Sequence, residues 1–412
     1  MKTPEGSLDR LQIPPAAGKT VLTATLWTIN LASISASVLV YVFLAHYAYS
    51  QINSLLVSEF VLFAPMVMPV LLGFQLNQVA SRVSARTLLL GANLIGAAVC
   101  AALFLAIPLS ALTVLTGAGI VGTLDAVQRI ARIVAIKRYY SPQEVRFTVP
   151  LTLTAQFIAG AMAGAIIAFF PGQLTTAVVA AATLLLLGIA AGCALLLPGT
   201  PPEAGHGRSG SPGLAECLAM LRRNPALRDA LIAFVILGAF FQGFYNISRV
   251  ALPAHHLGLG QTYVGLLQIV ASLSAVAGAL SFYFLSRKQL KFHLSYIAAV
   301  CAGAMLLSCS LKDPAASFSS YFVFFFFFEI AFFRLQGDIM VATPSRDMPV
   351  VATVQYAMVY AGMMLAIAIG AVLVNAFGLT ITALFFVFGF YAASAAHRRL
   401  SSSRHHSDPG DS

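Results

Sequence analysis

Four polar side chains recur at helical spacing within the apolar segment 111–136. Asp125, Gln128, Arg129 and Arg132 stand at positions i, i+3, i+4 and i+7, which places them on one face of a helix. Burial disfavours the charged form of the Asp125 carboxyl, whereas a neighbouring guanidinium favours it. Competition between these two effects can make a proton switch. The simpler alternative is a fixed Asp125–Arg129 ion pair that only orients the helix.

A second set of ionisable side chains lies in the segment 316–340. Arg334 and Asp338 are four residues apart and can pair, whereas Glu329 has no obvious partner on its own helix. A buried carboxylate without a partner is expected to be protonated or to pair across the bundle. The run Phe324–Phe328 is better explained by packing and lipid contact than by an aromatic binding site. The residues that we predict to couple to protons are Asp125, Arg129 and Glu329.

Further polar side chains in apolar segments are candidate contacts for a small molecule. Glu59 and Arg249 fall near the outer ends of their segments, where they can flank the mouth of a cavity. The alternative for each candidate is an interhelical hydrogen bond, and Arg249 can instead extend toward the interface. The predicted binding residues are Glu59, Arg132, Gln156, Gln242, Tyr245, Asn246, Arg249, Gln268, Arg334, Gln355 and Tyr356.

The sequence lacks the motifs of common enzymatic chemistries. There is no phosphate-binding Gly-x-x-x-x-Gly-Lys-[Ser/Thr] loop, so ATP is not expected to be a direct energy source. Neither His-Glu-x-x-His nor Gly-x-Ser-x-Gly occurs. The five cysteines are scattered, and the paired histidines have no other ligand types at metal-site spacing. We therefore expect no enzymatic activity, no cofactor and no metal.

The elements that must carry these residues are long apolar runs. The chain is 59% hydrophobic, and its few charged residues cluster at short intervals. A run of about 20 residues matches the ~30 Å hydrocarbon thickness of a bilayer, and as a helix it satisfies its own backbone hydrogen bonds. The sequence predicts an all-α integral membrane protein with twelve transmembrane helices. The predicted spans are 21–44, 54–76, 87–109, 111–136, 147–170, 174–197, 228–250, 261–285, 292–311, 316–340, 350–375 and 377–396.

The basic residues are distributed unevenly between the two sides of these spans. If the N-terminus is cytoplasmic, the inside segments hold 19 of the 24 Lys and Arg residues, and the outside loops hold only Lys312. This asymmetry is the positive-inside signature. We therefore predict an even number of spans with both termini in the cytoplasm. The Ala-rich composition, the few charges and the short loops favour a bacterial inner membrane. The net charge of +10 reflects this topology and not a nucleic-acid-binding patch.

The chain divides into two halves that share local sequence. Ser81-Arg82 followed by Arg86 recurs as Ser286-Arg287 followed by Lys291, at an offset of 205 residues. Similar sequences after the fifth and eleventh spans are offset by 206 residues. A parallel repeat of this kind is typical of one large transporter class. The predicted organisation is a six-helix half at 1–197, a cytoplasmic linker with a short amphipathic helix at 198–227, a second half at 228–396 and a tail at 397–412.

The chain resembles the major facilitator superfamily over nearly its whole length. In that family the loop between spans 2 and 3 carries a Gly-x-x-x-Asp-Arg-x-Gly-Arg-type motif. Here Arg82 and Arg86 match its basic positions, Ser81 replaces its acidic residue, and Asn77 and Ser84 replace its glycines. The resemblance implies a conformational role for this loop and its counterpart. The residues concerned are Arg82, Arg86, Arg287 and Lys291.

The finer resemblance is to bacterial drug and siderophore exporters. In span 5 the segment Gly160-Ala161-Met162-Ala163-Gly164 keeps the small-residue spacing of exporters but lacks their proline. The resemblance implies a secondary transporter in the lipid bilayer that works by alternating access, and we expect it to be a monomer. Because the chain has no ATP-binding loop, we expect the proton gradient to drive it, and the first interpretation is export of a small amphiphilic or anionic metabolite. Uptake of a nutrient or ferric siderophore is one alternative. A transporter-like membrane sensor is another.

Overall fold

The computed structural model describes residues 16–52, 55–106, 109–170, 175–199, 214–288 and 293–406, and these residues fold almost entirely into helices. The first half contains α1 (Ala16–Ser50), α2 (Leu55–Arg82), α3 (Ala85–Ala101), α4 (Ala111–Tyr139), α5 (Pro142–Phe169) and α6 (Thr176–Leu195). The second half contains α7 (Leu214–Arg223), α8 (Pro225–Leu237), α9 (Gly243–Ala251), α10 (Gln261–Arg287), α11 (Leu294–Ser310), α12 (Pro314–Ala342), α13 (Met348–Phe377) and α14 (Leu379–His406).

The lengths and compositions of these helices agree with the twelve-span prediction. Within the described ranges, ten helical segments are long and apolar enough to cross a membrane. One of them, Pro225–His256, joins α8 and α9 through the π-helical turn η2 (Gly238–Gln242) and continues into a second turn, η3 (Leu252–His256). The shorter apolar stretches Phe60–Gly73 in α2 and Leu294–Ser310 in α11 occupy the remaining two span positions.

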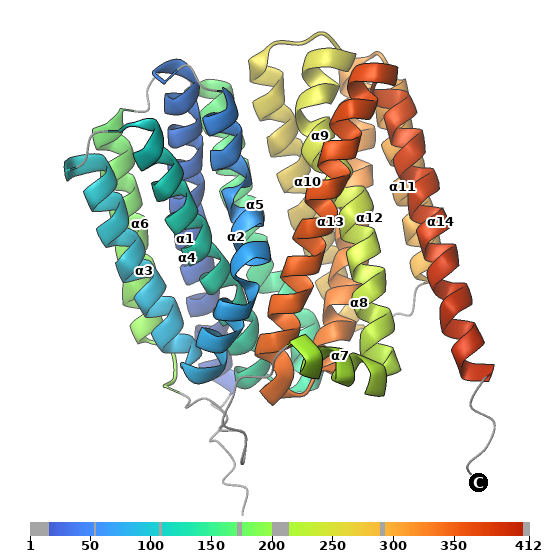
Figure 1. Cartoon of the computed structure of the whole chain (residues 1–412), viewed down its shortest axis with the longest axis horizontal. Coiled ribbons are helices and arrows are strands. Elements are labelled where there is room, and N and C mark those ends of the chain that lie inside the picture. Colours follow the sequence, from blue (N-terminus) through green and yellow to red (C-terminus); the bar gives the residue numbers. More distant parts are fainter. Residues whose placement is uncertain are drawn as a thin grey trace, which may run out of the picture.

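The spans form two bundles that lie side by side (Figure 1). In the first bundle α1 packs against α2, α5 and α6, and α4 packs against α2 and α3. In the second bundle α12 packs against α8, α10 and α11. Across the boundary α5 contacts α10 and α12, while α13 contacts α2 and α4. A functional site between the halves is therefore bordered by helices from both bundles.

The halves approach each other closely where α5 meets α10. A Cβ atom added to Gly164 would lie 2.8 Å from the carbonyl oxygen of Gly265, and one added to Gly265 would lie 2.6 Å from that of Gly164. Neither position has room for a side chain. A Cβ on Gly160 would lie 3.0 Å from Ser272 Oγ. The small-residue spacing in α5 thus permits backbone contact between helices, as small residues do in other membrane bundles.

The halves also meet through polar groups at one end of the molecule, which we call the basic end because α2 and α10 end there at Arg82 and Arg287. Lys137 on α4 donates a hydrogen bond to the carbonyl oxygen of Met340, in the last turn of α12. Arg146 on α5 forms an ion pair of 3.1 Å with Asp338 on α12. α7 lies at this same end (Figure 1).

The predicted boundaries of the linker stay a prediction. Residues 200–213 lie outside the described residues, whereas α7 falls in the part of the linker for which an amphipathic helix was expected. The phenylalanine run is mainly a packing element of the second bundle. Phe324 and Phe328 are fully buried, and Phe325 is nearly so.

Candidate functional site

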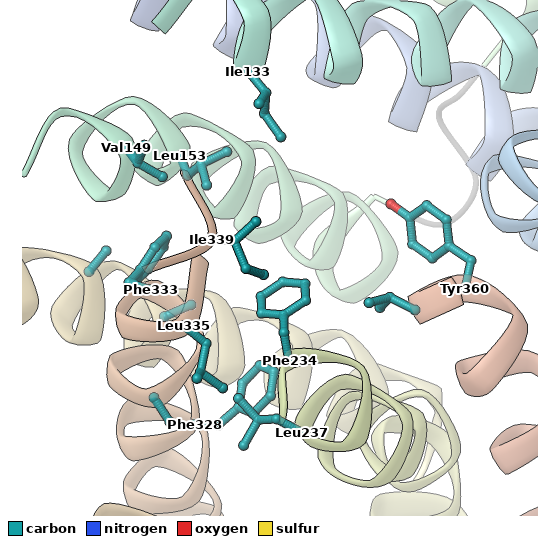
Figure 2. Packing of buried hydrophobic residues seen from close by; sticks show 14 of the residues in the cluster. Ile133, Val149, Leu153, Phe234, Leu237, Phe328, Phe333, Leu335, Ile339 and Tyr360 are labelled. Atoms are coloured by element: carbon teal, nitrogen blue, oxygen red, sulfur yellow. The ribbon is translucent and has the colours of Figure 1, made fainter. Parts of the chain in front are cut away.

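A cavity of about 110 Å³ lies between the two halves, and we call it the central cavity. Its walls come from α4 and α5 of the first half and from α8, η2, α12 and α13 of the second. Ile133, Phe234 and Tyr360 extend toward this space from three different helices (Figure 2). The polar side chains that line it are Arg129, Arg132, Gln156, Gln242, Glu329, Gln336, Tyr356 and Tyr360.

The Asp125–Arg129 ion pair predicted from helical spacing is present in α4. Arg129 Nε lies 2.9 Å from Asp125 Oδ2, and the Asp125 side chain is only 2% exposed. Gln128 turns from this face toward α3, where its amide donates a hydrogen bond of 3.1 Å to Asn93 Oδ1. The face therefore presents one neutralised arginine and one further arginine to the space between the halves.

Arg132 supplies the positive charge that Asp125 does not neutralise. The residue is 5% exposed, and its Nε atom has no hydrogen-bond partner. It lines the central cavity and also a small adjoining pocket that includes Asn30 and Ser33 of α1. The planar fork of a guanidinium can hold both oxygens of a carboxylate, so the open donor of Arg132 could bind an anion.

Glu329 faces the central cavity from α12 in the second half. It is 3% exposed, and its Oε2 atom has no hydrogen-bond partner. A Cβ added to Gly278 of α10 would lie 3.0 Å from Glu329 Cβ, so α10 closely covers the back of the residue. Glu329 therefore presents a buried carboxyl group with an open acceptor atom to the cavity.

Gln336 completes the polar wall of the second half, and the sequence analysis did not select it. Gln355, which was selected, is fully buried and does not line the central cavity. Gln355 on α13 donates a hydrogen bond to Gln336 on α12, while Gln336 Nε2 and Gln355 Oε1 have no partner. Gln336 follows Glu329 by seven residues, so both lie on one face of α12. That spacing was the signal by which Gln336 could have been found.

The wall of the central cavity also contains a pair of stacked tyrosines and a π-helical turn. The rings of Tyr356 and Tyr360 stack with centroids 5.7 Å apart. The π-helical turn η2 brings Gly238 and Gln242 to the cavity wall. π-helical turns occur frequently at functional sites, because they change the direction in which side chains project.

Several predicted binding residues form hydrogen bonds within the protein and do not line the central cavity. Tyr245 donates a hydrogen bond of 2.8 Å to Gln268 Oε1, and Asn246 donates one of 2.8 Å to the carbonyl oxygen of Gln242. Arg249 lies beside Tyr245, and Arg334 is half-buried outside the cavity wall. The side chain of Glu59 lies outside the described residues.

Three of the four residues expected to act in the conformational loops lie at the basic end. Arg82 is exposed, Arg86 is half-buried, and Arg287 donates a hydrogen bond of 3.2 Å to the Tyr283 hydroxyl. Ser84, which replaces a glycine of the family motif, caps α3 by accepting a hydrogen bond from the Thr87 amide. Lys291 lies outside the described residues.

Two six-helix bundles around a charged, buried cavity define a class of polytopic membrane transporters. The sequence model of the Major Facilitator Superfamily matches residues 25–355. The chain belongs to this superfamily, and its members are transporters, not enzymes. A search of curated proteins gave no significant match.

Solved structures of transporters share this fold at low sequence identity. A bacterial homologue of the iron transporter ferroportin, in an outward-facing state, is 11% identical with a TM-score of 0.69, over 92% of this chain and 99% of its own. The human organic anion transporter MFSD10 (TETRAN) is 12% identical with a TM-score of 0.71, at the same coverages. The E. coli fucose:proton symporter FucP is 14% identical with a TM-score of 0.66, over 91% and 98%.

Proposed function

We propose that the protein is a proton-coupled secondary transporter that exports a small anionic or amphiphilic metabolite, such as a drug or siderophore. The observation that carries this proposal is the unneutralised Arg132 guanidinium on one wall of the central cavity, across from a wall that holds Glu329 and Gln336. The cavity lies between the halves, where rocking of the bundles would expose it to each side in turn.

The charges in the cavity support an anionic cargo. Arg129 is paired with Asp125, so the wall formed by α4 keeps the charge of Arg132. A carboxylate held by Arg132 would lie near the stacked Tyr356 and Tyr360, whose hydroxyl groups can donate hydrogen bonds to it. One of the solved relatives of the fold is an organic anion transporter, which agrees with this assignment.

The same charges also support a second candidate, uptake by symport. Protonation of Asp125 would release Arg129 and add its positive charge to that of Arg132. Protonation of Glu329 would remove a negative charge from the cavity. Both protonation events would raise the affinity of the cavity for an anion. By linkage, a bound anion would raise the affinity for protons by the same factor. Antiport requires the opposite, since the proton must displace the cargo.

The test is the pH dependence of anion transport in proteoliposomes. The probes are carboxyfluorescein and citrate, measured with an imposed pH gradient and a lumenal pH dye. If efflux is coupled to proton entry, an inward proton gradient should drive the probe anion out of the vesicles. If the protein is a symporter, the same gradient should drive the probe anion into the vesicles together with protons. A pH gradient that moves no probe anion in either direction, in protein of native helicity, would refute proton-coupled anion transport.

The proposed orientation is tested independently of transport. We propose that the basic end faces the cytoplasm of a bacterial inner membrane and that the protein works as a monomer. Single cysteines at Ser209 and Lys312, in a background without the five native cysteines, would be labelled in whole cells with an impermeant thiol reagent. We expect labelling at residue 312 only. Labelling at residue 209 alone would reverse the orientation.

A further inference from the structure

A second and larger cavity lies on the outer side of the second half, and we call it the peripheral groove. Its volume is about 210 Å³, and its walls come from α8, α11, α12 and α14. α11 and α14 form the edge of the molecule farthest from the first half (Figure 1). The peripheral groove shares no lining residue with the central cavity. It is therefore separate from the space between the halves and lies at the outer edge of the second half.

The peripheral groove is polar at one end and apolar along its length. Ala298, Leu335 and Phe390 lie along its length, while His397 and Arg398 on α14 border it toward the basic end. Arg398 is exposed, and His397 is half-buried. The charged end is cationic, so the groove matches an amphiphile with an anionic head and an apolar tail.

The depth of the peripheral groove matches one leaflet of a membrane. Arg398 stands close to the end of the apolar stretch Leu379–Leu400, which is the end that meets the interface. Phe390 lies eight residues before it, which corresponds to about 12 Å of helix. One leaflet of hydrocarbon is about 15 Å thick, half of the ~30 Å core. An acyl chain can therefore enter the groove while its headgroup stays at the level of Arg398.

We propose that the peripheral groove is a binding site for an anionic glycerophospholipid. The phosphate pairs with Arg398 and accepts a hydrogen bond from His397, and one acyl chain packs against Ala298 and Phe390. A guanidinium at the interface favours an anionic headgroup over a zwitterionic one, in which an attached ammonium offsets the phosphate charge.

The bound lipid would contact the same span that lines the central cavity. Leu237 borders the peripheral groove, and the next residue, Gly238, borders the central cavity. An occupant of the groove therefore supports the outer side of the helix at the point where η2 begins. This link to transport depends on the proposed function, whereas lipid binding itself does not.

The experiment measures lipid retention by native mass spectrometry. Purified, delipidated protein is incubated with phosphatidylglycerol or with phosphatidylcholine of identical acyl chains. We expect wild type to retain one phosphatidylglycerol with a several-fold preference. Arg398→Gln should reduce that retention to the level of phosphatidylcholine, whereas the matched control Arg287→Gln, at the end of α10, should not. Equal retention of the two lipids by wild type, or an unchanged preference in Arg398→Gln, would overturn the proposal.

A second pair of variants tests whether the acyl chain enters the groove. Ala298→Phe adds a ring to the wall of the groove and should reduce retention of both lipids. Val300→Phe adds the same ring at an exposed position of α11 outside the groove and should leave retention unchanged. Helical circular dichroism checks that both variants are folded. Equal retention by folded Ala298→Phe and Val300→Phe would show that the chain binds elsewhere. If Ala298→Phe does not fold, the Arg398 comparison still decides the proposal.

Discussion

The charged faces of α4 and α12 approach the same cavity from opposite halves, but they handle charge in different ways. On α4 the acid is neutralised within its own helix, because Arg129 lies one turn from Asp125 and the two atoms that pair are 2.9 Å apart. On α12 the acid has no such neighbour, and Glu329 Oε2 has no hydrogen-bond partner. The first face holds a charged pair, whereas the second holds a buried carboxyl group with an unsatisfied oxygen.

The difference teaches which carboxylate can exchange a proton with least structural cost. Neutralising Asp125 leaves a largely buried guanidinium without its counterion, which costs ~3–5 kcal/mol when such a pair is broken. Neutralising Glu329 removes an unfavourable charge and breaks no ion pair. We therefore expect substitutions at the two positions to separate transport from stability.

The largest effect is expected at Asp125. Asp125→Asn removes the charge that holds Arg129, so proton-driven flux of carboxyfluorescein should be abolished and thermal stability should fall. Flux and melting temperature in proteoliposomes and detergent measure the two effects. Wild-type flux with an unchanged pH dependence would mean that Asp125 only orients α4.

The next largest effect is expected at Arg132, whose substitution tests whether the α4 side of the central cavity binds an anion. Arg132→Lys keeps the charge but loses the planar fork. The loss of one charge-assisted hydrogen bond, ~1.5–3 kcal/mol, should weaken anion binding roughly 10- to 100-fold. Binding of citrate by isothermal calorimetry measures this change. Arg82→Lys, at an exposed position on α2, is the matched control. Equal affinities in the two variants would contradict an anion site at Arg132.

A smaller effect on stability, with a large effect on pH dependence, is expected at Glu329. Glu329→Gln mimics the neutral acid, so the melting temperature should change little or rise. The variant should lose the part of the pH dependence of transport that arises from Glu329. Glu329→Ala provides the contrast, because it opens a cavity next to Gly278 and should destabilise the fold. A pH profile identical to wild type in Glu329→Gln would remove Glu329 from the proton pathway.

The smallest effect is expected for the ion pair at the basic end. The side chains of Arg146 and Asp338 are 53% and 38% exposed, so solvent screens their interaction. Arg146→Gln should change the free energy of unfolding by less than about 1 kcal/mol. Lys137→Met removes a buried donor to the carbonyl of Met340 and should cost more. Denaturation of both variants side by side measures the difference. An equal or larger loss for Arg146→Gln would show that the pair is a principal latch.

The sequence predicts those features of the site that depend on one helix at a time. The Asp125–Arg129 pair follows from a spacing of four residues, and the spans follow from lengths of apolar sequence. Contacts between helices do not follow from spacing. Asp338 has Arg334 four residues before it, yet it also pairs with Arg146 of the other half. The hydrogen bond between Gln336 and Gln355 likewise requires knowing that α12 and α13 meet.

The same reason explains which predicted binding residues were displaced from the central cavity. Tyr245 and Gln268 are polar side chains on two apolar helices, and either could face a ligand. They form a hydrogen bond to each other, because α9 and α10 lie next to one another in the second bundle. Only the packing of neighbouring helices distinguishes a polar group that waits for a ligand from one that is already satisfied.

The contact between Gly164 and Gly265 has a mechanical consequence. Most helix interfaces adapt to motion by rotating side chains. Here the carbonyl oxygen of each glycine lies within 2.8 Å of the point where a Cβ on the other glycine would be. The side chains of Ala168 and Gln268 pack beside the two glycines but do not separate the two backbones. If the bundles move relative to each other, α5 and α10 can rotate about this contact, but main-chain atoms fix the distance between the two helices. A methyl group at either position would force α5 and α10 apart at this contact.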